Sequence, residues 1–352
     1  MKTSATSPHH QTEVFDYMRV NTFIKDIVNA RALGTAFELG LIDLLLINQH
    51  SSPDNLIKEI ECDGQGLRLL LTLLKGNQVI EECDGEIKLS RQFMKALPYF
   101  DLLKAKLDFA NFVASDFTNL FTALIKNPGQ FSRNARVFDL FGYNRCIDYS
   151  PENYRLTKLW MRLTTALTRY EAQACMQYHD FGNHQHILDI GGNSGEFVLQ
   201  ICKKHPRIIA TVFDLPVVCD IGQEHIRNEP ESERINFIKG NAFTNVLPEG
   251  FDLITFKSML HDWPDEEAKQ LILKAGQSLK PGSQLLIFER GPVELGETTL
   301  PYSMIPFLLF FRSFRLPVLY EEQLREIGFQ DIEVKRIDLE TPFFLVTATK
   351  GL

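Results

Sequence analysis

Hydrophobic and polar positions follow two different patterns along this chain of 352 residues. From about residue 181 onward, short apolar runs bounded by glycine, proline and acidic residues predict buried strands, and amphipathic stretches between them predict helices. This alternation is typical of a doubly wound α/β sheet. The predicted strands are His186–Ile190, Ala210–Phe213, Ile235–Lys239, Phe251–Lys257, Gln284–Phe288, Asp331–Arg336 and Phe343–Thr349, and the predicted helices cover about 195–204, 217–227, 265–279 and 321–327.

The first 180 residues have a mainly helical pattern instead. Apolar residues recur at helical spacing in Thr22–Leu41 and Leu67–Leu74, and Ser52-Pro53-Asp54 is a helix start. The stretch Val79–Leu89, with Asp84-Gly85 at its centre, predicts a β-hairpin. Three helices and a hairpin indicate a winged-helix unit. We therefore expect a disordered polar tail (1–11), a winged-helix-like dimerisation domain (12–100), a helical connecting region (101–180) and the sheet domain (181–352).

Charge and composition exclude several classes of protein. Winged-helix units often bind DNA, but residues 1–100 hold ten Lys and Arg against thirteen Asp and Glu, and the chain has a net charge of −8, so we expect no nucleic-acid partner. No apolar run is long enough to span a membrane, and the N-terminus lacks an apolar signal core. The six cysteines form no C-x-x-C pair, which predicts a reduced, cytoplasmic protein.

A glycine-rich turn follows the first predicted strand of the sheet, in the run Asp189-Ile-Gly191-Gly192-Asn-Ser-Gly195. The dinucleotide template G-x-G-x-x-G fails here, because Asn193 and Glu196 stand where its second and third glycines belong, and no P-loop occurs in the chain. A glutamate at the start of a helix would also repel a pyrophosphate. Asp214, at the tip of the next strand, suits the hydroxyls of a ribose. These features predict a nucleoside cofactor without phosphate, such as S-adenosylmethionine.

A second candidate site lies in the segment Phe256–Glu267. His261 is expected on a loop at the ligand edge of the sheet, where an imidazole can act as a base near neutral pH. Glu289 ends the next strand and is placed to hold the other imidazole nitrogen. Trp263 could lie against an aromatic ring of the cofactor. The histidine spacings show no metal-binding pattern, so we expect no metal.

Three motifs then identify a family. Asp189-Ile-Gly-Gly-Asn-Ser-Gly195, Asp214-Leu-Pro216 and Leu260-His-Asp-Trp-Pro-Asp-Glu266 occur in this order, and Lys280-Pro-Gly282 precedes the strand that ends in Glu289. Together they resemble the class I methyltransferases of the caffeic-acid and acetylserotonin O-methyltransferase type. The resemblance covers nearly the whole chain. It implies a Rossmann-like sheet domain, an N-terminal mainly helical winged-helix dimerisation domain, S-adenosylmethionine as cofactor, and a homodimer with swapped or interlocked N-terminal helices.

The resemblance also implies roles for single residues. His261 would be the general base and Glu289 its partner, while a second family glutamate would map to Glu321 or Glu322. Asn241 stands where the family usually has an aspartate near the adenine, and we expect only weaker binding from that change. The implied cofactor-binding residues are Asp189, Gly191, Gly192, Gly195, Asp214, Leu215, Asn241, Ala242, Phe243, Lys257 and Trp263.

The expected reaction is methyl transfer to a hydroxyl of a small acceptor, started by proton removal at His261. The phenylalanine-rich stretch 304–317 suggests a flat or apolar acceptor, such as a phenol or a polyketide, although core or dimer packing explains it equally well. Arg312 and Arg315 are candidates for an acidic group of the acceptor. The alternatives are C-methylation of an enolisable keto acid, non-methylating chemistry with the same cofactor, and a cofactor-sensing DNA-binding regulator.

Overall fold

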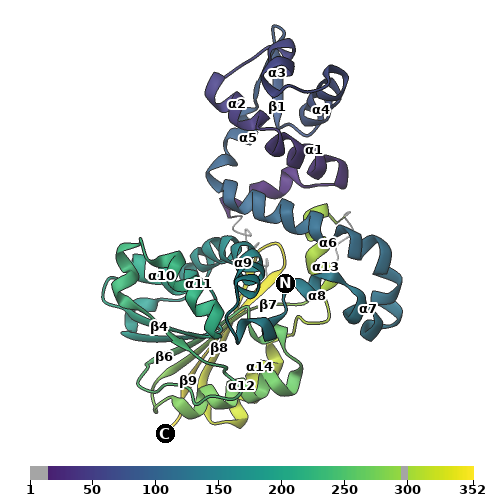
Figure 1. Ribbon diagram of the computed structural model, residues 1–352. Helices are drawn as coiled ribbons and strands as arrows, with labels where there is room; N and C mark the ends of the chain where they lie inside the picture. The colour runs from purple at the N-terminus through teal and green to yellow at the C-terminus, as the bar shows by residue number, and fades with distance from the viewer. Residues whose placement is uncertain (1–14, 295–299) are drawn as a thin grey trace, which may run out of the picture.

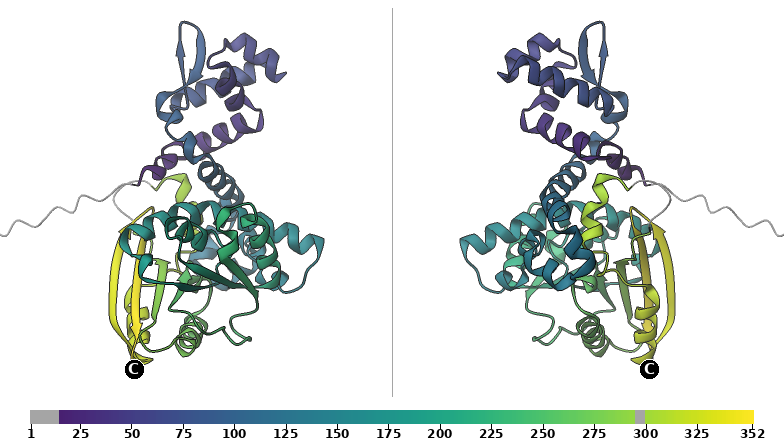
Figure 2. Two further views of the ribbon diagram at one scale, coloured as in Figure 1. Left: turned by 90° about the vertical axis from the view of Figure 1, so that its left-hand side faces the viewer. Right: turned by 90° about the vertical axis from the view of Figure 1, so that its right-hand side faces the viewer.

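The computed structural model describes residues 15–294 and 300–352 and shows two bodies joined by long helices (Figure 1). A helical N-terminal body projects from a sheet domain that holds the C-terminus, and side views show the same separation (Figure 2). The tail predicted at residues 1–11 lies outside the described residues.

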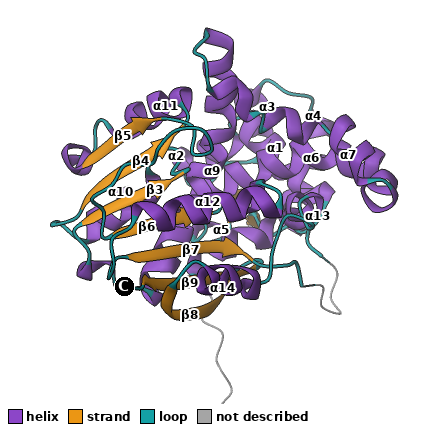
Figure 3. Cartoon of the chain, turned by 90° about the horizontal axis from the view of Figure 1, so that it is seen from below, coloured by secondary structure: helices purple, strands orange, loops and turns teal. Residues whose placement is uncertain are grey.

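Seven strands form the sheet, in the order β5-β4-β3-β6-β7-β9-β8 (Figure 3). The first five are parallel, and β9 runs antiparallel between β7 and β8. This arrangement confirms the predicted doubly wound sheet, and every predicted strand is present with ends shifted by three residues at most. The strands are β3 (His186–Ile190), β4 (Ile209–Asp214), β5 (Ile235–Lys239), β6 (Leu253–Lys257), β7 (Gln284–Arg290), β8 (Phe329–Asp338) and β9 (Pro342–Lys350).

Helices cover both faces of the sheet, because alternate strand residues are apolar on both sides. Ile187 and Val212 pack with α9 (Pro151–Tyr178) and α10 (Glu196–Lys204) on one face. Leu188 and Phe213 pack with α12 and α14 on the other face. The helices of this domain are α10 (Glu196–Lys204), α11 (Pro216–Ile226), α12 (Asp265–Ser278), α13 (Ile305–Leu309) and α14 (Pro317–Glu326).

The N-terminal body confirms the hairpin and, in part, the helix predicted at Thr22–Leu41. The helix is present there as α1 but is shorter at both ends. The Asp26 side chain accepts a hydrogen bond from the Asn29 N–H at 2.8 Å and starts α1, and Gly40 takes a left-handed conformation (φ 69°) after α1 ends. The elements are α1 (Ile27–Glu38), α2 (Leu41–Asn48), α3 (Pro53–Ile60), α4 (Gly64–Gly76), β1 (Ile80–Cys83), β2 (Glu86–Leu89) and α5 (Arg91–Met94).

Two long helices connect the bodies. The first, α6 (Phe100–Lys126), leaves the N-terminal body and contacts the second, α9 (Pro151–Tyr178). Two short helices, α7 (Pro128–Asn134) and α8 (Arg136–Leu140), lie between them in the chain. The C-terminal half of α9 packs on the sheet through Ala172 and Cys175, while its middle reaches the loops at the carboxyl ends of β3 and β6. The connecting helices therefore border the predicted ligand edge.

Candidate active site

The glycine loop after β3 turns tightly against its neighbours. The Gly191 N–H donates to the Phe213 carbonyl at 2.9 Å, and Gly191 and Gly195 both have positive φ angles (68° and 74°). A Cβ on Gly191 would lie only 2.4 Å from Cγ of Met259, in the loop that carries His261. Only glycine tolerates this combination of backbone angle and close contact. The glycine loop and the His261 loop therefore touch each other.

Asp214 is fixed beside the glycine loop by backbone donors. One carboxylate oxygen accepts from the Asn193 N–H at 2.8 Å and the other from the Leu215 N–H at 2.7 Å. Burial raises the pKa of Asp214 to about 6, although both hydrogen bonds act in the opposite direction. Each oxygen keeps a lone pair free, so the carboxylate can still accept from two vicinal hydroxyls.

Asp189 provides a test of whether this loop suits S-adenosylmethionine. Its Oδ1 accepts from the Thr255 hydroxyl at 2.7 Å, whereas Oδ2 is buried with no hydrogen-bond partner in the described part of the chain. A Cβ at Gly192 would lie 2.5 Å from Oδ2, so glycine keeps the space beside it open. Burial raises the pKa of Asp189 to about 7. A buried acceptor in an open backbone cradle fits a ligand that carries an ammonium group.

The predicted adenine region is brought together by the loops after β5 and β6. The rings of Phe243 and Trp263 meet edge to face with centroids 4.6 Å apart. Asn241 uses its side-chain oxygen to accept from the Phe243 N–H at 2.9 Å, and Lys274 donates to the Ala242 carbonyl. The amide oxygen expected to receive an adenine amino group therefore already stabilises its own turn, and its cofactor contact stays a prediction.

Lys257, predicted as a cofactor contact, points its ammonium group at α9. It donates to the Thr168 hydroxyl at 2.9 Å and forms a buried ion pair with Glu171, which also pairs with Arg290. Burial lowers the pKa of Lys257 despite the opposing effect of Glu171. The structure thus shows Lys257 anchoring α9 to the end of β6, and a contact with the cofactor stays a prediction.

His261 and Glu289 form the predicted pair. Nδ1 of His261 lies 2.6 Å from Oε2 of Glu289, while the other carboxylate oxygen accepts from the Met259 and Leu260 N–H groups, each at 2.7 Å. The side chains are 13% and 1% exposed. This carboxylate therefore holds both the imidazole ring and the backbone of its loop, as a base-orienting group must.

A second carboxylate and a wall of aromatic rings surround the other side of His261. Nε2 is 3.5 Å from Oδ1 of Asp262, and the Tyr143 hydroxyl donates to Oδ2 of Asp262 at 2.7 Å. Burial alone would lower the pKa of His261, but the charges of Glu289 and then Asp262 raise it. The His261 ring packs edge-on against Phe314. A separate set of ring contacts begins at Tyr143, which bonds Asp262, and joins Tyr143, Trp160, Phe141 and Phe310.

Three further candidates lie elsewhere in the structure. Glu321 pairs with Arg325 on α14 at 2.8 Å and makes no hydrogen bond to His261, so a catalytic role for Glu321 stays a prediction. Arg312 donates to the Leu124 carbonyl, and Arg315 pairs with Asp265 at 2.6 Å. Both arginines are therefore already bonded within the fold, and a contact with an acidic group of the acceptor stays a prediction.

Sequence patterns missed the partners on the connecting helices. Glu171 and Thr168, which hold Lys257, are separated from it by more than eighty residues, and no local pattern marks them. Asp262 was inside the recognised motif and could have been singled out because it neighbours the base.

Within residues 15–294 and 300–352, no group of three or more metal-ligating side chains could hold an ion. None of the helices in these ranges has the length and apolar character that a membrane span requires.

Comparison with known proteins agrees with this geometry. The O-methyltransferase domain family matches residues 123–330, more than half of the chain. The chain belongs to the O-methyltransferase family. Acetylserotonin O-methyltransferase of Gallus gallus is 25% identical over 92% of this chain and 96% of its own. Mitomycin biosynthesis 6-O-methyltransferase of Streptomyces lavendulae is 23% identical over 77% of this chain and 76% of its own.

Solved O-methyltransferase structures share the fold. Human N-acetylserotonin methyltransferase, in complex with S-adenosylmethionine, matches with a TM-score of 0.74 at 21% identity and covers 97% of this chain and 99% of its own. The mitomycin 7-O-methyltransferase structure matches with a TM-score of 0.69 at 19% identity and covers 91% of this chain and 94% of its own. The present chain is therefore an S-adenosylmethionine-dependent O-methyltransferase with a Rossmann-like sheet domain and an N-terminal helical region.

Proposed function

We propose that this O-methyltransferase methylates a hydroxyl of a small aromatic or polyketide-like molecule, with His261 as general base. The observation that carries the proposal is the His261–Glu289 pair at 2.6 Å, on a loop that packs against the glycine loop. The base and the predicted cofactor site thereby share one edge of the sheet, which is the edge where such sheets bind ligands.

Each residue of the proposed site has its own role. Glu289 accepts the Nδ1 proton of His261, which leaves Nε2 free to take the proton of the acceptor hydroxyl. The same carboxylate stabilises the imidazolium that results, because it stays charged and buried beside the ring. When bound, S-adenosylmethionine supplies the methyl group on a positively charged sulfur. We propose that Asp189, Asp214 and the glycine loop hold it, with Phe243 and Trp263 at the adenine.

The aromatic wall beside His261 supports a flat, apolar acceptor. Tyr143 and Trp160 lie with ring centroids 5.8 Å apart, and Phe310, from the phenylalanine-rich stretch, packs on Phe141 at 6.0 Å. Such surfaces bury planar rings through stacking and edge contacts. Related enzymes are named for hydroxylated aromatic substrates, among them the 3-hydroxy-5-methyl-1-naphthoate 3-O-methyltransferase of Streptomyces sahachiroi. We therefore expect acceptors of this chemical class.

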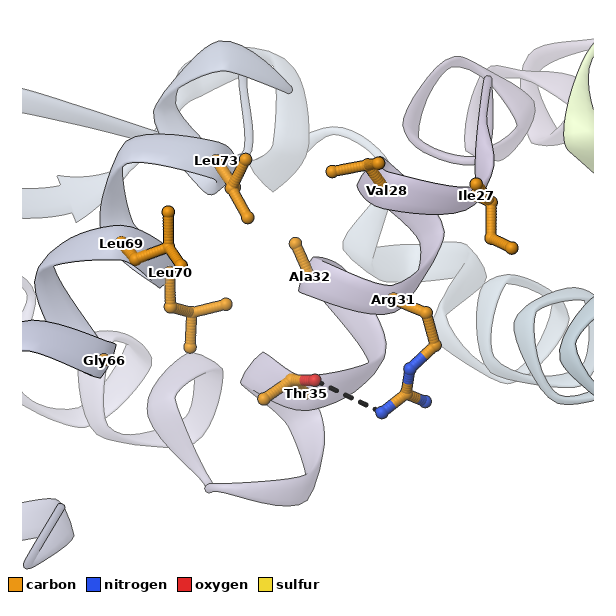
Figure 4. A pocket seen from close by; sticks show the side chains of 9 residues that line it. All are labelled: Ile27, Val28, Arg31, Ala32, Thr35, Gly66, Leu69, Leu70 and Leu73. Atoms are coloured by element: carbon orange, nitrogen blue, oxygen red, sulfur yellow. Dashed lines mark hydrogen bonds between the residues drawn. The ribbon is translucent and has the colours of Figure 1, made fainter. Parts of the chain in front are cut away.

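We also propose that the N-terminal body is a winged-helix-like unit that forms a homodimer. Helices α1 and α4 flank an apolar groove of about 380 Å³ lined by residues such as Val28, Leu70 and Leu73 (Figure 4). At its rim, Ile27 and Leu69 are 53% and 62% exposed. Large apolar side chains that are exposed together favour contact with another protein surface.

The six cysteines without disulfides support a cytoplasmic location.

The substitution His261→Gln tests the proposed base. We expect it to cut turnover by at least about a hundredfold, because general-base catalysis contributes about 10²–10⁴-fold. Binding of S-adenosylhomocysteine, measured by calorimetry, should stay within a factor of about three, because His261 is not among the proposed cofactor residues. The assay uses methyl-labelled S-adenosylmethionine with hydroxynaphthoates and N-acetylserotonin as trial acceptors.

Two outcomes would contradict the proposal. Equal turnover of the variant and the natural protein would remove the base role from His261. Label found on a carbon rather than an oxygen of the product would replace O-methylation by C-methylation, which the same base could support by forming an enolate.

A further inference from the structure

Arg169 of α9 forms ion pairs with two other helices, α10 and α6. Its Nε donates to Oε1 of Glu196, the first residue of α10, at 3.0 Å. Its Nη1 donates to Oδ2 of Asp101, in the first turn of α6, at 2.7 Å. One guanidinium therefore connects the helix that leaves the N-terminal body with the helix that follows the glycine loop.

The Glu196 end of this bridge is buried and well supported. The Glu196 side chain is 1% exposed, and its other oxygen lies 2.6 Å from Nε2 of His225 on α11, while Gln200 donates to the first oxygen at 2.8 Å. Burial alone would raise the pKa of Glu196, but the hydrogen bond from His225 and the charge of Arg169 lower it. A buried carboxylate that loses one charged partner pays a desolvation penalty, so Glu196 must move or take up a proton.

The glycine loop is placed directly before this ion pair. Gly195 precedes Glu196, and the hydroxyl of Ser194 receives a hydrogen bond from Thr165 of α9 at 2.7 Å. Thr165 and Arg169 are four residues apart and therefore lie on the same side of α9. Ser194 and Glu196, which flank Gly195, are thus both held by α9, and α9 is held in turn by Asp101 of α6.

We propose that Arg169 is a positioning residue that transmits the docking of α6 to the glycine loop, so that cofactor affinity depends on the contact between α6 and α9. The inference rests on the proposed placement of S-adenosylmethionine at this loop. Arg169 would act through Glu196 without touching the cofactor itself. Its loss should therefore raise the KM for the cofactor more than it lowers kcat.

The chain contains a matched control on the same two helices. Arg162 of α9 lies seven residues from Arg169 and donates to Asp108 of α6 at 2.9 Å. Within the described residues it makes no hydrogen bond or ion pair with the glycine loop or α10. Substituting Arg162 removes an α9–α6 ion pair and leaves the link to Glu196 intact. A difference between the two variants therefore isolates the link to the loop from general helix packing.

The experiment compares Arg169→Gln, Arg169→Lys and Arg162→Gln by calorimetry with S-adenosylhomocysteine and by initial rates. We expect Arg169→Gln to weaken binding about tenfold and to change kcat less than about threefold, because an oriented charged hydrogen bond to a buried partner is lost. Arg169→Lys should recover part of the affinity. Arg162→Gln should stay within about twofold of the natural protein, since exposed pairs contribute little. Equal effects of the two glutamine variants, or unchanged binding in Arg169→Gln, would overturn the inference.

A milder variant keeps the test decisive if Arg169→Gln does not fold. Asp101→Asn removes only the charge on the α6 side of the bridge, and we expect it to weaken binding about threefold although Asp101 lies outside the glycine loop. In the double variant that combines Asp101→Asn with Arg169→Lys, the two losses of affinity should not add, since both substitutions weaken the same connection. Additive losses would show independent effects and refute the bridge. Failure of the natural protein to bind S-adenosylhomocysteine would instead refute the proposed cofactor site.

Discussion

Two histidines near opposite edges of the same sheet are both partly buried, but the pKa values of their rings are shifted in opposite directions. His261 follows β6 at the carboxyl edge and has a carboxylate at each ring nitrogen, Glu289 at 2.6 Å and Asp262 at 3.5 Å. His179 follows α9 near the amino end of β3. Its ring packs edge-on against Phe181 at 4.6 Å and stacks on His184 at 5.5 Å, and its Nε2 is buried with no hydrogen-bond partner among the described residues.

The comparison of His261 with His179 shows that neighbouring charged groups, rather than burial, decide whether a histidine ring holds a proton. Burial lowers the pKa of His179 to about 4, with a further contribution from His184, so this ring stays neutral at pH 7. Burial acts in the same direction on His261, yet its two carboxylates outweigh it and raise the pKa. A histidine becomes a base that can hold a proton when a carboxylate is built into the fold beside it.

Removal of the Glu289 carboxylate should have the largest effect on turnover. In Glu289→Gln, the amide oxygen can still accept from the Met259 and Leu260 N–H groups, so the loop should keep its shape while His261 loses its charged partner. We expect kcat to fall about a hundredfold, because the imidazolium is no longer stabilised. The pKa of His261, followed by NMR titration, should fall below its ordinary value, as burial already lowers that of His179.

The matched control is Glu266→Gln, which changes an exposed glutamate that pairs with Lys269 in the same helix. This variant should match the natural protein in both measurements. A Glu289→Gln variant with normal turnover would show that His261 does not need its carboxylate, and the comparison between the two histidines would lose its functional meaning.

Acid should reveal the opposite behaviour of His179. Its folded pKa lies below the ordinary value of 6.5, so the unfolded chain binds a proton that the folded chain refuses, and stability falls as the pH drops from about 6.5 toward 4. Because the ring is partly accessible, we expect a contribution of only about 1–2 kcal/mol at pH 4.5. Urea unfolding at pH 7 and 4.5 measures this loss, which His179→Phe should reduce.

The smallest effect on turnover is expected at Tyr143, which contacts Asp262 and not His261 itself. Tyr143→Phe removes the hydroxyl that donates to Asp262 at 2.7 Å. Without that donor the Asp262 carboxylate is less stable and supports the charge of His261 less well, so the pKa of His261 should fall slightly and kcat should fall by about threefold. NMR titration and initial rates measure the two changes. An unchanged pKa would show that the second carboxylate has no part in the contrast with His179.

The sequence predicted what depends on local order. The strands, the glycine loop, the Asp84-Gly85 hairpin and the His261–Glu289 pair follow from patterns within short segments or at the ends of adjacent parallel strands. The partners on α6 and α9 could not be predicted, because Arg169, Glu196 and Asp101 meet only after two long helices pack across the sheet edge. The break at Gly40 was missed because apolar residues continue in helical spacing on both sides of it.

The length of α9 has a consequence for how new activities can arise. Its 28 residues span about 42 Å, and Trp160, on the aromatic wall, lies about one and a half turns before Thr165, which contacts the glycine loop. Side chains around Trp160 can be exchanged to admit a different acceptor while the register of the downstream half is preserved. A one-residue insertion between Trp160 and Thr165 would rotate the residues around Trp160 by about 100° relative to those around Thr165. Evolution in this helix should therefore proceed by substitution and not by changes of length.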